Sequence, residues 1–530
     1  MPTLRKLSCC VALASAFAAP AIAADVTPEQ AAQIQTQLQA WSGLFGSLPN
    51  GSAGAPVLKV TADGDHYRIE LLAPDTLVKQ GVVAAGPLET LQAKPIDGGR
   101  YTLGGLSIPQ PLKFTFSPSM MDGLNGAAAA AQPGAAPGKP AKPTEPLVVE
   151  ATTKGQTLTG VIDPTFATPS NADTNISGLH ATAAGVIADV AEFVSHTAWT
   201  PTGNGLVNIA NQTNVKTISV SGEMKSDIPF AVFVDSGKLD SAISGAKPGY
   251  SASMSQKITE LTESLKRTGD APLSAEQRQT AHEAVKAFDA ALVNQKSTAS
   301  IDGLKFASGG ESTEIAHSEF FGSFATDAGK LTFAFGTTIE GLKSSLIPPG
   351  PMQDLLPKRI VLNPRIYGIS RVDAIALADH AIDADMKDPA KSAAIQGEAM
   401  ALLAKGPVGV AIDQLVIDIP GSSLKGSATV DIPNPANITA HALLTMDGLD
   451  ALIQKANSTP MLAQAAPGLI FLKGIGKADG NVTTWNISYV ANKIMVNDTD
   501  LSAMIPGNQP AAQPRPQGQP RPRPPAPKSP

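Results

Sequence analysis

The clearest structural pattern of this 530-residue chain lies in Ser422-Ser-Leu-Lys-Gly-Ser-Ala-Thr-Val-Asp-Ile432 and, after a short break, in Ile438-Thr-Ala-His-Ala-Leu-Leu-Thr-Met446. Apolar or small residues alternate with polar ones along most of both runs. Successive side chains of a strand point to opposite faces, so this period predicts two strands with one buried face each. The runs Trp485–Tyr489 and Ile494–Asn497 then predict a closing hairpin with an aromatic inner row.

The same period of two appears near the start of the chain. Val57–Val60 and His66–Leu71 are joined through Asp63-Gly64-Asp65, which predicts a hairpin. Three further runs continue this meander: Leu88–Ala93, Tyr101–Leu103 and Leu112–Phe116. The sequence Thr27-Pro28-Glu29-Gln30 before them predicts a helix start with a capping box. The apolar face of this helix docks on the sheet or, alternatively, lies on a partner or membrane surface.

The middle of the chain mixes strands with helices. The predicted strands are Leu147–Ala151, Thr157–Ile162, Val215–Val220, Phe230–Val234, Ser300–Phe306 and Lys330–Phe335. A helical hairpin is expected near residues 254–295, and its second helix begins at the Ser274 and Gln277 capping box. This hairpin either packs on the neighbouring sheet or forms a lid or partner-binding arm. A helical stretch is expected over Val372–Leu403, with a break near Pro389.

Together these runs predict a β-rich α+β protein with one or more long curved antiparallel sheets and helices packed on one face. A weak repeat at Phe233–Asp240, Phe335–Lys343 and Leu444–Asp450 suggests three units of strand, turn and short helix, although chance resemblance is the alternative. The expected organisation begins with a signal peptide at 1–23, a helix and β meander at 24–125 and a flexible Ala/Gly/Pro-rich linker at 126–146. A β-rich region at 147–370, helices and a C-terminal sheet at 371–506, and a disordered basic Pro-rich tail at 507–530 follow.

The N-terminus has the three parts of an export signal. Arg5 and Lys6 precede an apolar run, and Ala21-Ile22-Ala23 supplies a small-residue cleavage site. We expect cleavage after Ala23, with retention as a membrane anchor as the alternative, and no later run is long and apolar enough to span a bilayer. The only cysteines, Cys9 and Cys10, lie inside the signal. A cysteine-free mature chain fits a bacterial periplasm better than a eukaryotic secretory route.

Composition and charge exclude several classes of protein. The chain is 43% hydrophobic and 16% charged, so it can bury a core and is no disordered polyelectrolyte. Its formal net charge is −6, and the acidic body has no basic stripe, which argues against a nucleic-acid partner. Within the proline-rich tail, Arg515, Arg521, Arg523 and Lys528 are the only charged residues. The tail is expected to be solvated, although it could contact anionic envelope polymers.

No catalytic, cofactor-binding or metal signature is found. A Gly-x-Ser-x-Gly elbow is missing from the sequence, and Gly474-Ile-Gly-Lys477 lacks the spacing of a phosphate loop. Ser422 and Lys425 match Ser-x-x-Lys, but that motif needs a helix and these residues enter a predicted strand. We therefore predict no cofactor and no catalytic residue, and an enzyme is the less favoured interpretation.

Asp379 and Asp383 are the one local oddity. Both lie four residues apart among apolar positions of a predicted helix. If buried together, the two carboxylates would share a proton or bind a cation. The favoured alternative is that the helix bends or ends near Asp379 and that both aspartates cap it or face water.

The signal, the strands of Leu424–Ile432, the turn and helix of Asp447–Leu452 and the closing Trp485–Asn497 together resemble the uncharacterised YdgA-like and AsmA-like envelope proteins of Gram-negative bacteria. The resemblance is diffuse over Ala24–Pro506. It implies a long curved sheet in the periplasm, a link to envelope or lipid homeostasis and no established catalytic residue. The cleavable signal and the basic tail depart from the family, whose members often keep a membrane anchor.

Three hypotheses follow. The first is a non-catalytic exported envelope protein that binds a lipid, another hydrophobic ligand or an envelope protein on its apolar sheet face, because such a face must be covered by something. The second is a cell-surface or wall-associated interaction protein that uses the basic tail. The third is a secreted hydrolase whose site is assembled from distant residues.

Overall fold

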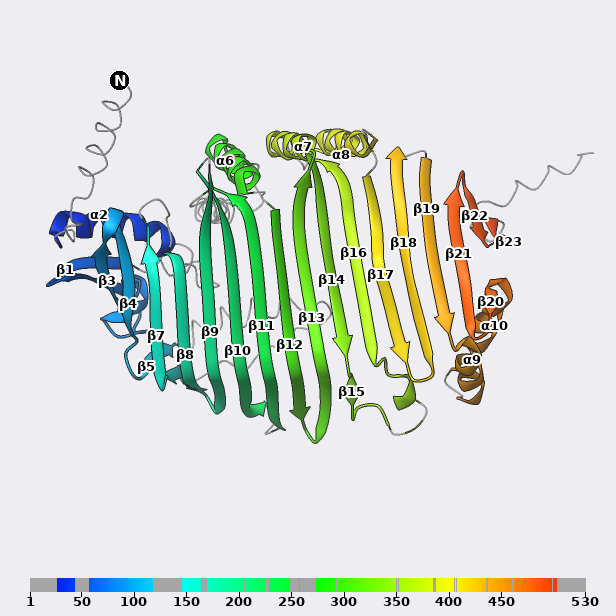
Figure 1. The fold of residues 1–530 in the computed structure, drawn as a ribbon, viewed down its shortest axis with the longest axis horizontal. Helices are drawn as coiled ribbons and strands as arrows, with labels where there is room; N and C mark the ends of the chain where they lie inside the picture. The colour runs from blue at the N-terminus through cyan, green and yellow to red at the C-terminus, as the bar shows by residue number, and fades with distance from the viewer. Residues whose placement is uncertain are drawn as a thin grey trace, which may run out of the picture.

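The structure is a computed structural model that describes residues 26–502, apart from segments 43–56, 118–144, 164–168, 225–227, 248–256, 258–272, 292–293, 385–387, 435–436 and 460–461 and positions 204, 349, 351, 405, 407 and 498. Twenty-three strands of this described part form one antiparallel sheet, which is long and curved (Figure 1). The predicted β-rich architecture is therefore confirmed. The expected signal peptide, the expected tail and the expected linker apart from residues 145 and 146 lie outside the described residues, as does most of the expected first helix of the hairpin.

The sheet follows the order of the chain almost throughout. The first strands are β1 (Val57–Asp63), β2 (His66–Leu72), β3 (Pro87–Ile96) and β4 (Arg100–Ser107), and β4 pairs with β7 (Gly155–Ile162). Next come β8 (Pro169–Ala183), β9 (Val186–Gly203), β10 (Leu206–Met224), β11 (Ile228–Ala246), β12 (Asn294–Ser308), β13 (Glu311–Asp327) and β14 (Lys330–Glu340). The last are β16 (Arg359–Ser370), β17 (Val408–Ile419), β18 (Ser422–Asn434), β19 (Asn437–Asp447), β21 (Val482–Val490), β22 (Lys493–Val496) and β23 (Thr499–Asp500). Four short strands pair at the margins: β5 (Leu112–Phe116), β6 (Leu147–Thr152), β15 (Lys343–Ser344) and β20 (Lys477–Asp479).

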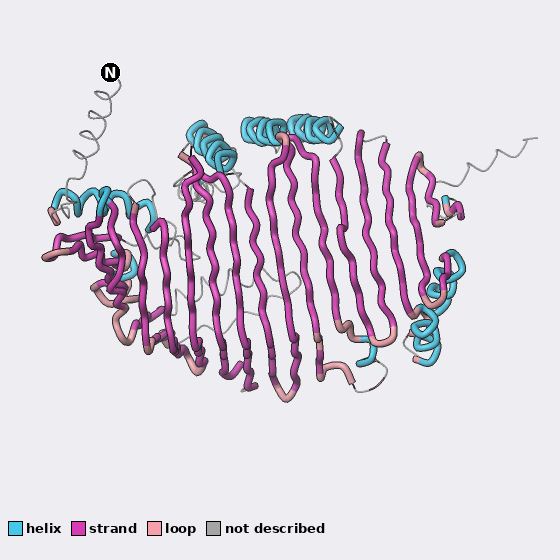
Figure 2. The backbone as a smooth tube through the Cα atoms, in the orientation of Figure 1, coloured by secondary structure: helices cyan, strands magenta, loops and turns pink. Residues whose placement is uncertain are grey.

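Some helices lie beside the first and last strands of this sheet, and others lie along one end of its strands, as both ribbon and tube views show (Figures 1 and 2). α2 (Pro28–Ser42) and the short α3 (Asp75–Lys79) lie at the N-terminal end. α6 (Ala275–Ala291), α7 (Arg371–Asp383) and α8 (Pro389–Ala404) follow the upper edge in Figure 1. α9 (Leu449–Ser458) and α10 (Ala466–Ile475) lie at the C-terminal end.

α2 docks on the first strands, which confirms the first of its two predicted placements. Ile34 and Leu38 are buried in one cluster with Leu58 and Tyr67. The Gln35 side chain accepts a hydrogen bond from the backbone N–H of Val60 at 3.1 Å, so the helix also occupies a polar group of the edge strand β1. Covering an edge in this way blocks further strand pairing.

On one side of the left-handed residues described below, the long strands give the sheet one apolar and one polar face. Cross-strand partners share a face, and a step of one residue changes the face. One row of partners runs through Ile176, Phe193, Val215, Gly237, Ile301, Ser318, Ile339, Ile360, Ile417, Leu424 and Met446. The row one residue away runs through Ser177, Glu192, Lys216, Ser236, Asp302, His317, Glu340, Arg359, Asp418, Ser423 and Asp447. We call the side of the first row the apolar face and that of the second the polar face.

The polar row is held together by ion pairs between neighbouring strands. Lys216 Nζ lies 2.6 Å from Glu192 Oε2, and Arg359 Nε lies 3.1 Å from Glu340 Oε1. His317 Nδ1 lies 2.7 Å from Asp302 Oδ1, and this hydrogen bond lowers the pKa of the Asp302 carboxyl. Basic and acidic side chains on neighbouring strands are therefore paired at several points of this row, which suits a face in contact with water.

A row of left-handed residues crosses the sheet next to the polar row. Gly178, Thr217, Gly303 and Gly341 have φ of 57°, 46°, 64° and 68°. The pairs on both sides of these residues keep the same register. On the strands between them, Ala191 therefore lies opposite Gly178 and Thr217, Asp235 opposite Thr217 and Gly303, and Ala316 opposite Gly303 and Gly341. The left-handed region is strained for residues with a side chain, which explains why three of the four are glycine.

One local prediction is confirmed and another is wrong. The Ser274 hydroxyl accepts from the Gln277 backbone N–H at 3.2 Å while the Gln277 side chain accepts from the Ser274 N–H at 2.8 Å, which is the predicted capping box. The predicted repeat fails, because Phe233–Asp240 lies within the continuous strand β11 and Phe335–Lys343 contains no helix. Only Leu444–Asp450 has the expected order of strand, turn and helix.

Candidate functional site

The candidate site lies where the chain leaves β19 and folds a helix pair back towards the sheet. Gly448 has φ of 73° between β19 and α9. A Cβ at this position would collide with the carbonyl oxygen of Gly421 and would lie 3.1 Å from Ser422 Oγ. Glycine is therefore required for this turn, and the turn directs α9 towards the apolar face.

A cavity of about 810 Å³ lies between this helix pair and the sheet. Its walls are Leu424, Leu444, Met446, Leu449, Leu452, Leu469, Phe471, Leu472, Ile475, Trp485, Ile487, Ile494, Val496 and Leu501. These residues come from β18, β19, β21, β22, α9, α10 and the last turn of the described chain. Every one of them is apolar or aromatic.

The cavity offers no hydrogen-bonding group from its lining side chains. Trp485 carries the one polar side-chain atom among them, and its indole N–H donates to the Leu472 carbonyl oxygen at 2.8 Å. Trp485 is itself buried, in a cluster with Leu449 and Val496. The volume lies within the range of about 300–1,000 Å³ that is typical of small-molecule sites. Such walls suit an alkyl chain and provide no acid, base or nucleophile.

A close approach of backbone and side chain shapes the sheet wall of the cavity. Gly426 pairs with Leu444 on the apolar face. A Cβ on Gly426 would collide with Leu444 Cδ2 and would lie 2.8 Å from the Leu443 carbonyl oxygen. Because Gly426 has no side chain, the Leu444 side chain can lie over this point of β18 and form part of the cavity wall.

The apolar wall continues along the sheet beyond the helices. From Leu444, the same row leads through Gly426 to Leu415 and Leu362 and further to Phe320 and Leu239. Seven large apolar side chains of this face on β11–β17 are exposed: Leu239, Phe320, Phe333, Phe335, Leu362, Ile366 and Val410. Phe335 is the most open of them, at 54% exposure. The cavity is therefore the helix-covered end of a wider apolar surface.

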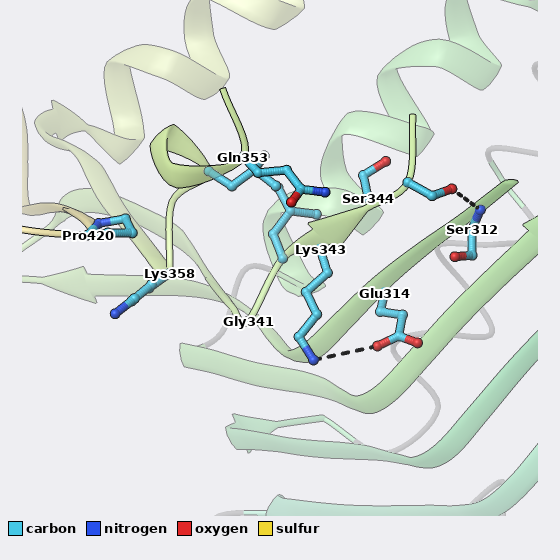
Figure 3. Close-up of a pocket in the computed structure, with 11 residues that line it drawn as sticks. Ser312, Glu314, Gly341, Lys343, Ser344, Gln353, Lys358 and Pro420 are labelled. Carbon is cyan, nitrogen blue, oxygen red and sulfur yellow. Dashed lines mark hydrogen bonds and ion pairs between the residues drawn. The ribbon is translucent and has the colours of Figure 1, made fainter. Parts of the chain in front are cut away.

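A second cavity, of about 520 Å³, lies beside the end of β14 and has a different character. Figure 3 shows Lys343 pointing towards Glu314 and the Ser312 backbone beside a serine hydroxyl. The Lys343–Glu314 pair has an N–O distance of 3.8 Å, and Ser312 N–H donates to Ser345 Oγ at 2.7 Å. These four residues thus contact one another in pairs and do not converge on a common ligand atom.

Asp379 and Asp383 reach across to the neighbouring helix α6. Asp379 Oδ1 lies 2.9 Å from His282 Nδ1, and Asp383 Oδ1 lies 3.0 Å from His282 Nε2. These hydrogen bonds raise the pKa of His282, with the Asp379 bond as the largest cause. A second ion pair, Arg371 Nε to Asp289 Oδ1 at 2.8 Å, joins the same helices. The two aspartates thus hold α6 against α7, and α7 has no buried residue.

Two other groups of polar residues do not form a reaction centre. Ser422 and Lys425 are three apart in β18, so they lie on opposite faces, and the Ser422 hydroxyl donates to the Gly448 carbonyl oxygen at 2.8 Å. Asp302 contacts both His317 and Ser236, but the serine donates to the aspartate at 3.0 Å and not to the histidine. A nucleophile needs contact with its base. Within the described ranges, no group of three or more His, Cys, Asp or Glu residues could hold a metal ion.

Comparisons with known proteins add no relative. No family model, no curated protein and no solved structure matches the chain. Among the helices of the described residues, none combines the length and the apolar character needed to cross a membrane.

The cavity was missed by the sequence analysis. Its helix-side wall comes from Leu449, Leu452, Leu469, Phe471, Leu472 and Ile475, and three of these lie in the run Leu469–Leu472, which follows Pro467. That run is apolar without interruption, which was the available signal, because a surface helix normally has one polar face. The alternation of Leu424–Ile432 did identify the apolar side of β18, where Leu424 lines the cavity, although the side chains of this run are half-buried.

Proposed function

We propose that this protein is a non-catalytic, exported envelope protein that binds a lipid or another ligand with a long apolar chain. The binding site is the cavity between α9, α10 and the apolar face of the sheet. The observation that carries the proposal is the lining of this cavity, in which all fourteen residues are apolar over about 810 Å³. The export signal and the resemblance to AsmA-like envelope proteins support the location and the ligand class.

The proposal explains why the cavity is placed on a sheet. Strands supply a stiff wall with every second side chain apolar, and the helices cover it with further apolar side chains. The rest of the apolar face, with exposed Phe320 and Phe335, provides contact area for a chain or a second ligand that extends beyond α9 and α10.

Binding is tested with a fluorescent fatty acid in solution and with native mass spectrometry of protein purified gently from an envelope fraction, followed by solvent extraction. The variant Leu444→Trp narrows the cavity, and Leu443→Trp is its matched control. Both leucines are neighbours on β19, but Leu443 lies on the polar face and is 49% exposed. We expect a several-fold weaker affinity for Leu444→Trp and an unchanged affinity for Leu443→Trp.

Circular dichroism and thermal unfolding show whether each variant is folded. Equal affinity of folded Leu444→Trp and wild type would contradict this site. A wild-type protein that binds no fatty acid and carries no extractable lipid would contradict the proposed function as a whole.

A further inference from the structure

The middle strands of the sheet present a wide uncharged area on the apolar face. These strands are β11, β12, β13, β14, β16 and β17, towards the centre of Figure 1. Four neighbouring rows of cross-strand partners cross them, through Phe333, Phe335, Thr337 and Ile339 of β14. Four rows on six strands give 24 positions, of which five are uncharged polar residues and none is charged. We call this area the apolar field.

The opposite face of the same strands has a different composition. Its charged residues include Lys238, Asp240, Glu319 and Arg365. Because the charges are confined to that face, the apolar field has the composition of a buried surface. All seven exposed apolar side chains already named on β11–β17 nevertheless lie in the field, and Phe335 is 54% exposed. Within the part of the chain that the structure describes, the field is therefore left open.

The apolar field is large enough for a stable protein interface. One position of a sheet face takes about 4.8 Å across the strands and about 6.8 Å along them, so the whole field covers about 800 Å². A standard interface takes about 800 Å² from each partner. The largest apolar patch of a typical monomer covers about 300–600 Å². The field thus exceeds what a monomer usually leaves open and matches what a stable dimer needs.

The side chains of the field alternate in size. Along one row, large and small residues take turns from strand to strand: Leu239, Ala299, Phe320, Thr337 and Leu362. When two such faces stack about 10 Å apart, a large side chain of one face can enter the space above a small side chain of the other. The field is therefore complementary to a second copy of itself.

We propose that the apolar field is the interface of a homodimer, in which two copies pack this face against each other about a twofold axis. A twofold axis brings the same surface of both copies together, so one field supplies both sides. No charge of the field has to lose its hydration when the faces meet. Leu424 and Leu444 of the cavity lie on β18 and β19, beyond the field, so the inference does not rest on the proposed function. A ligand chain that extends from the cavity past β18 enters the edge of this interface.

The test uses the chain from Ala24 to Pro530 and follows its mass by sedimentation velocity over a dilution series. The main variant is Phe335→Glu in the field. Phe306→Glu is the matched control, because Phe306 on β12 is 43% exposed and lies outside the field. We expect wild type and Phe306→Glu to dimerise alike. Phe335→Glu should dimerise roughly a hundredfold more weakly, because a twofold interface buries its unpaired carboxylate twice. Circular dichroism shows whether both variants are folded.

Thiol labelling locates the interface directly. From Ala24 onward the chain contains no cysteine. Gly322→Cys places a thiol in the field, at a position where an added Cβ has no atom within 4 Å. Ser323→Cys places one on the opposite face of β13. Gly322→Cys should react with a maleimide several-fold more slowly in the dimer than after dilution to the monomer, whereas Ser323→Cys should react at the same rate in both.

Several results would overturn the inference. They are a wild type that stays monomeric over the whole series, a folded Phe335→Glu that dimerises as tightly as wild type, and a Gly322→Cys that reacts equally fast in dimer and monomer. A monomer in which Gly322→Cys reacts only after bound lipid is removed would also overturn it and would assign the field to a lipid. Fatty-acid binding is measured separately, so failure of the dimer leaves the proposed function intact.

Discussion

Replacing Gly303 by alanine probes the left-handed row that crosses the long strands. Gly303 has φ of 64° in β12, and an added Cβ would collide with the Asp235 carboxylate of β11 and lie 2.8 Å from Asp235 Cβ. The left-handed backbone costs a non-glycine residue about 1–2 kcal/mol. Forcing an extra methyl group into packed surroundings costs about 1–3 kcal/mol. We therefore expect Gly303→Ala to lower the free energy of unfolding by about 2–5 kcal/mol.

Two comparison variants separate these costs. Asp235→Gly removes the side chain that the new methyl group would meet, so the double variant should recover the steric part, and the two substitutions should show a coupling of about 1–2 kcal/mol. Gly303→Asn keeps the crowding, but asparagine tolerates left-handed backbone better than alanine does.

Urea unfolding followed by circular dichroism measures the global effect, and amide hydrogen exchange in β12 and its neighbours measures the local one. A change below about 0.5 kcal/mol for Gly303→Ala would refute the reasoning, because a surface position without special geometry shows an effect of that size. Destabilisation without any coupling to Asp235→Gly would refute the steric part alone.

Three further predictions concern the helices and the cavity. The His282 contact between α6 and α7 should be strongest below about pH 6.5, the ordinary histidine pKa, and should weaken as pH rises through the raised pKa of the folded protein. The reason is that the neutral ring can donate a hydrogen bond to only one of its two aspartates. Hydrogen exchange of α6, corrected for the intrinsic rate, should show this trend in wild type and not in His282→Gln. Gly426→Ala should destabilise the protein by about 1–3 kcal/mol in urea unfolding and should weaken fatty-acid binding. Gly421→Asn is the control and should leave binding unchanged, because Gly421 lies at a left-handed turn where an added Cβ would have no atom within 4 Å. Trp485→Phe loses the hydrogen bond to the Leu472 carbonyl and should cost about 1 kcal/mol, with faster exchange confined to α10; uniform exchange across both helices would contradict the role of this bond in placing α10.

Local chemistry predicted the ends of elements well. The capping box at Ser274, the N-cap at Thr27 and the break before Pro389 depend on residues close in sequence, so they are visible without the fold. At Thr27 only half of the predicted box forms, because the Thr27 N–H donates to the Tyr67 hydroxyl and the Gln30 side chain accepts from that hydroxyl. The alternation of Leu424–Ile432 predicted a strand correctly for the same reason, because every second residue of this run of β18 is apolar or glycine.

The long strands were harder to predict. β8, β9 and β13 were missed, since their apolar faces contain Ser, Thr and Gly, which leaves the period of two weak. The left-handed row could not be predicted either. A glycine such as Gly303 signals a turn in sequence, and only the register across several strands shows that it lies inside a strand opposite Asp235.

The two ends and the middle of the sheet differ in how their apolar face is covered, and this difference supports a binding role for the cavity. Tyr67, with 0% exposure, belongs to the core under α2, whereas Phe335 on β14 is half exposed. At the C-terminal end the cover is incomplete, because α9 and α10 leave about 810 Å³ between themselves and the sheet. A helix pair that served stability alone would close that space, since interiors pack to the density of crystals and unfilled apolar volume lowers stability. The space, its wholly apolar walls and its continuation onto exposed strands are what a binding site for long apolar chains requires.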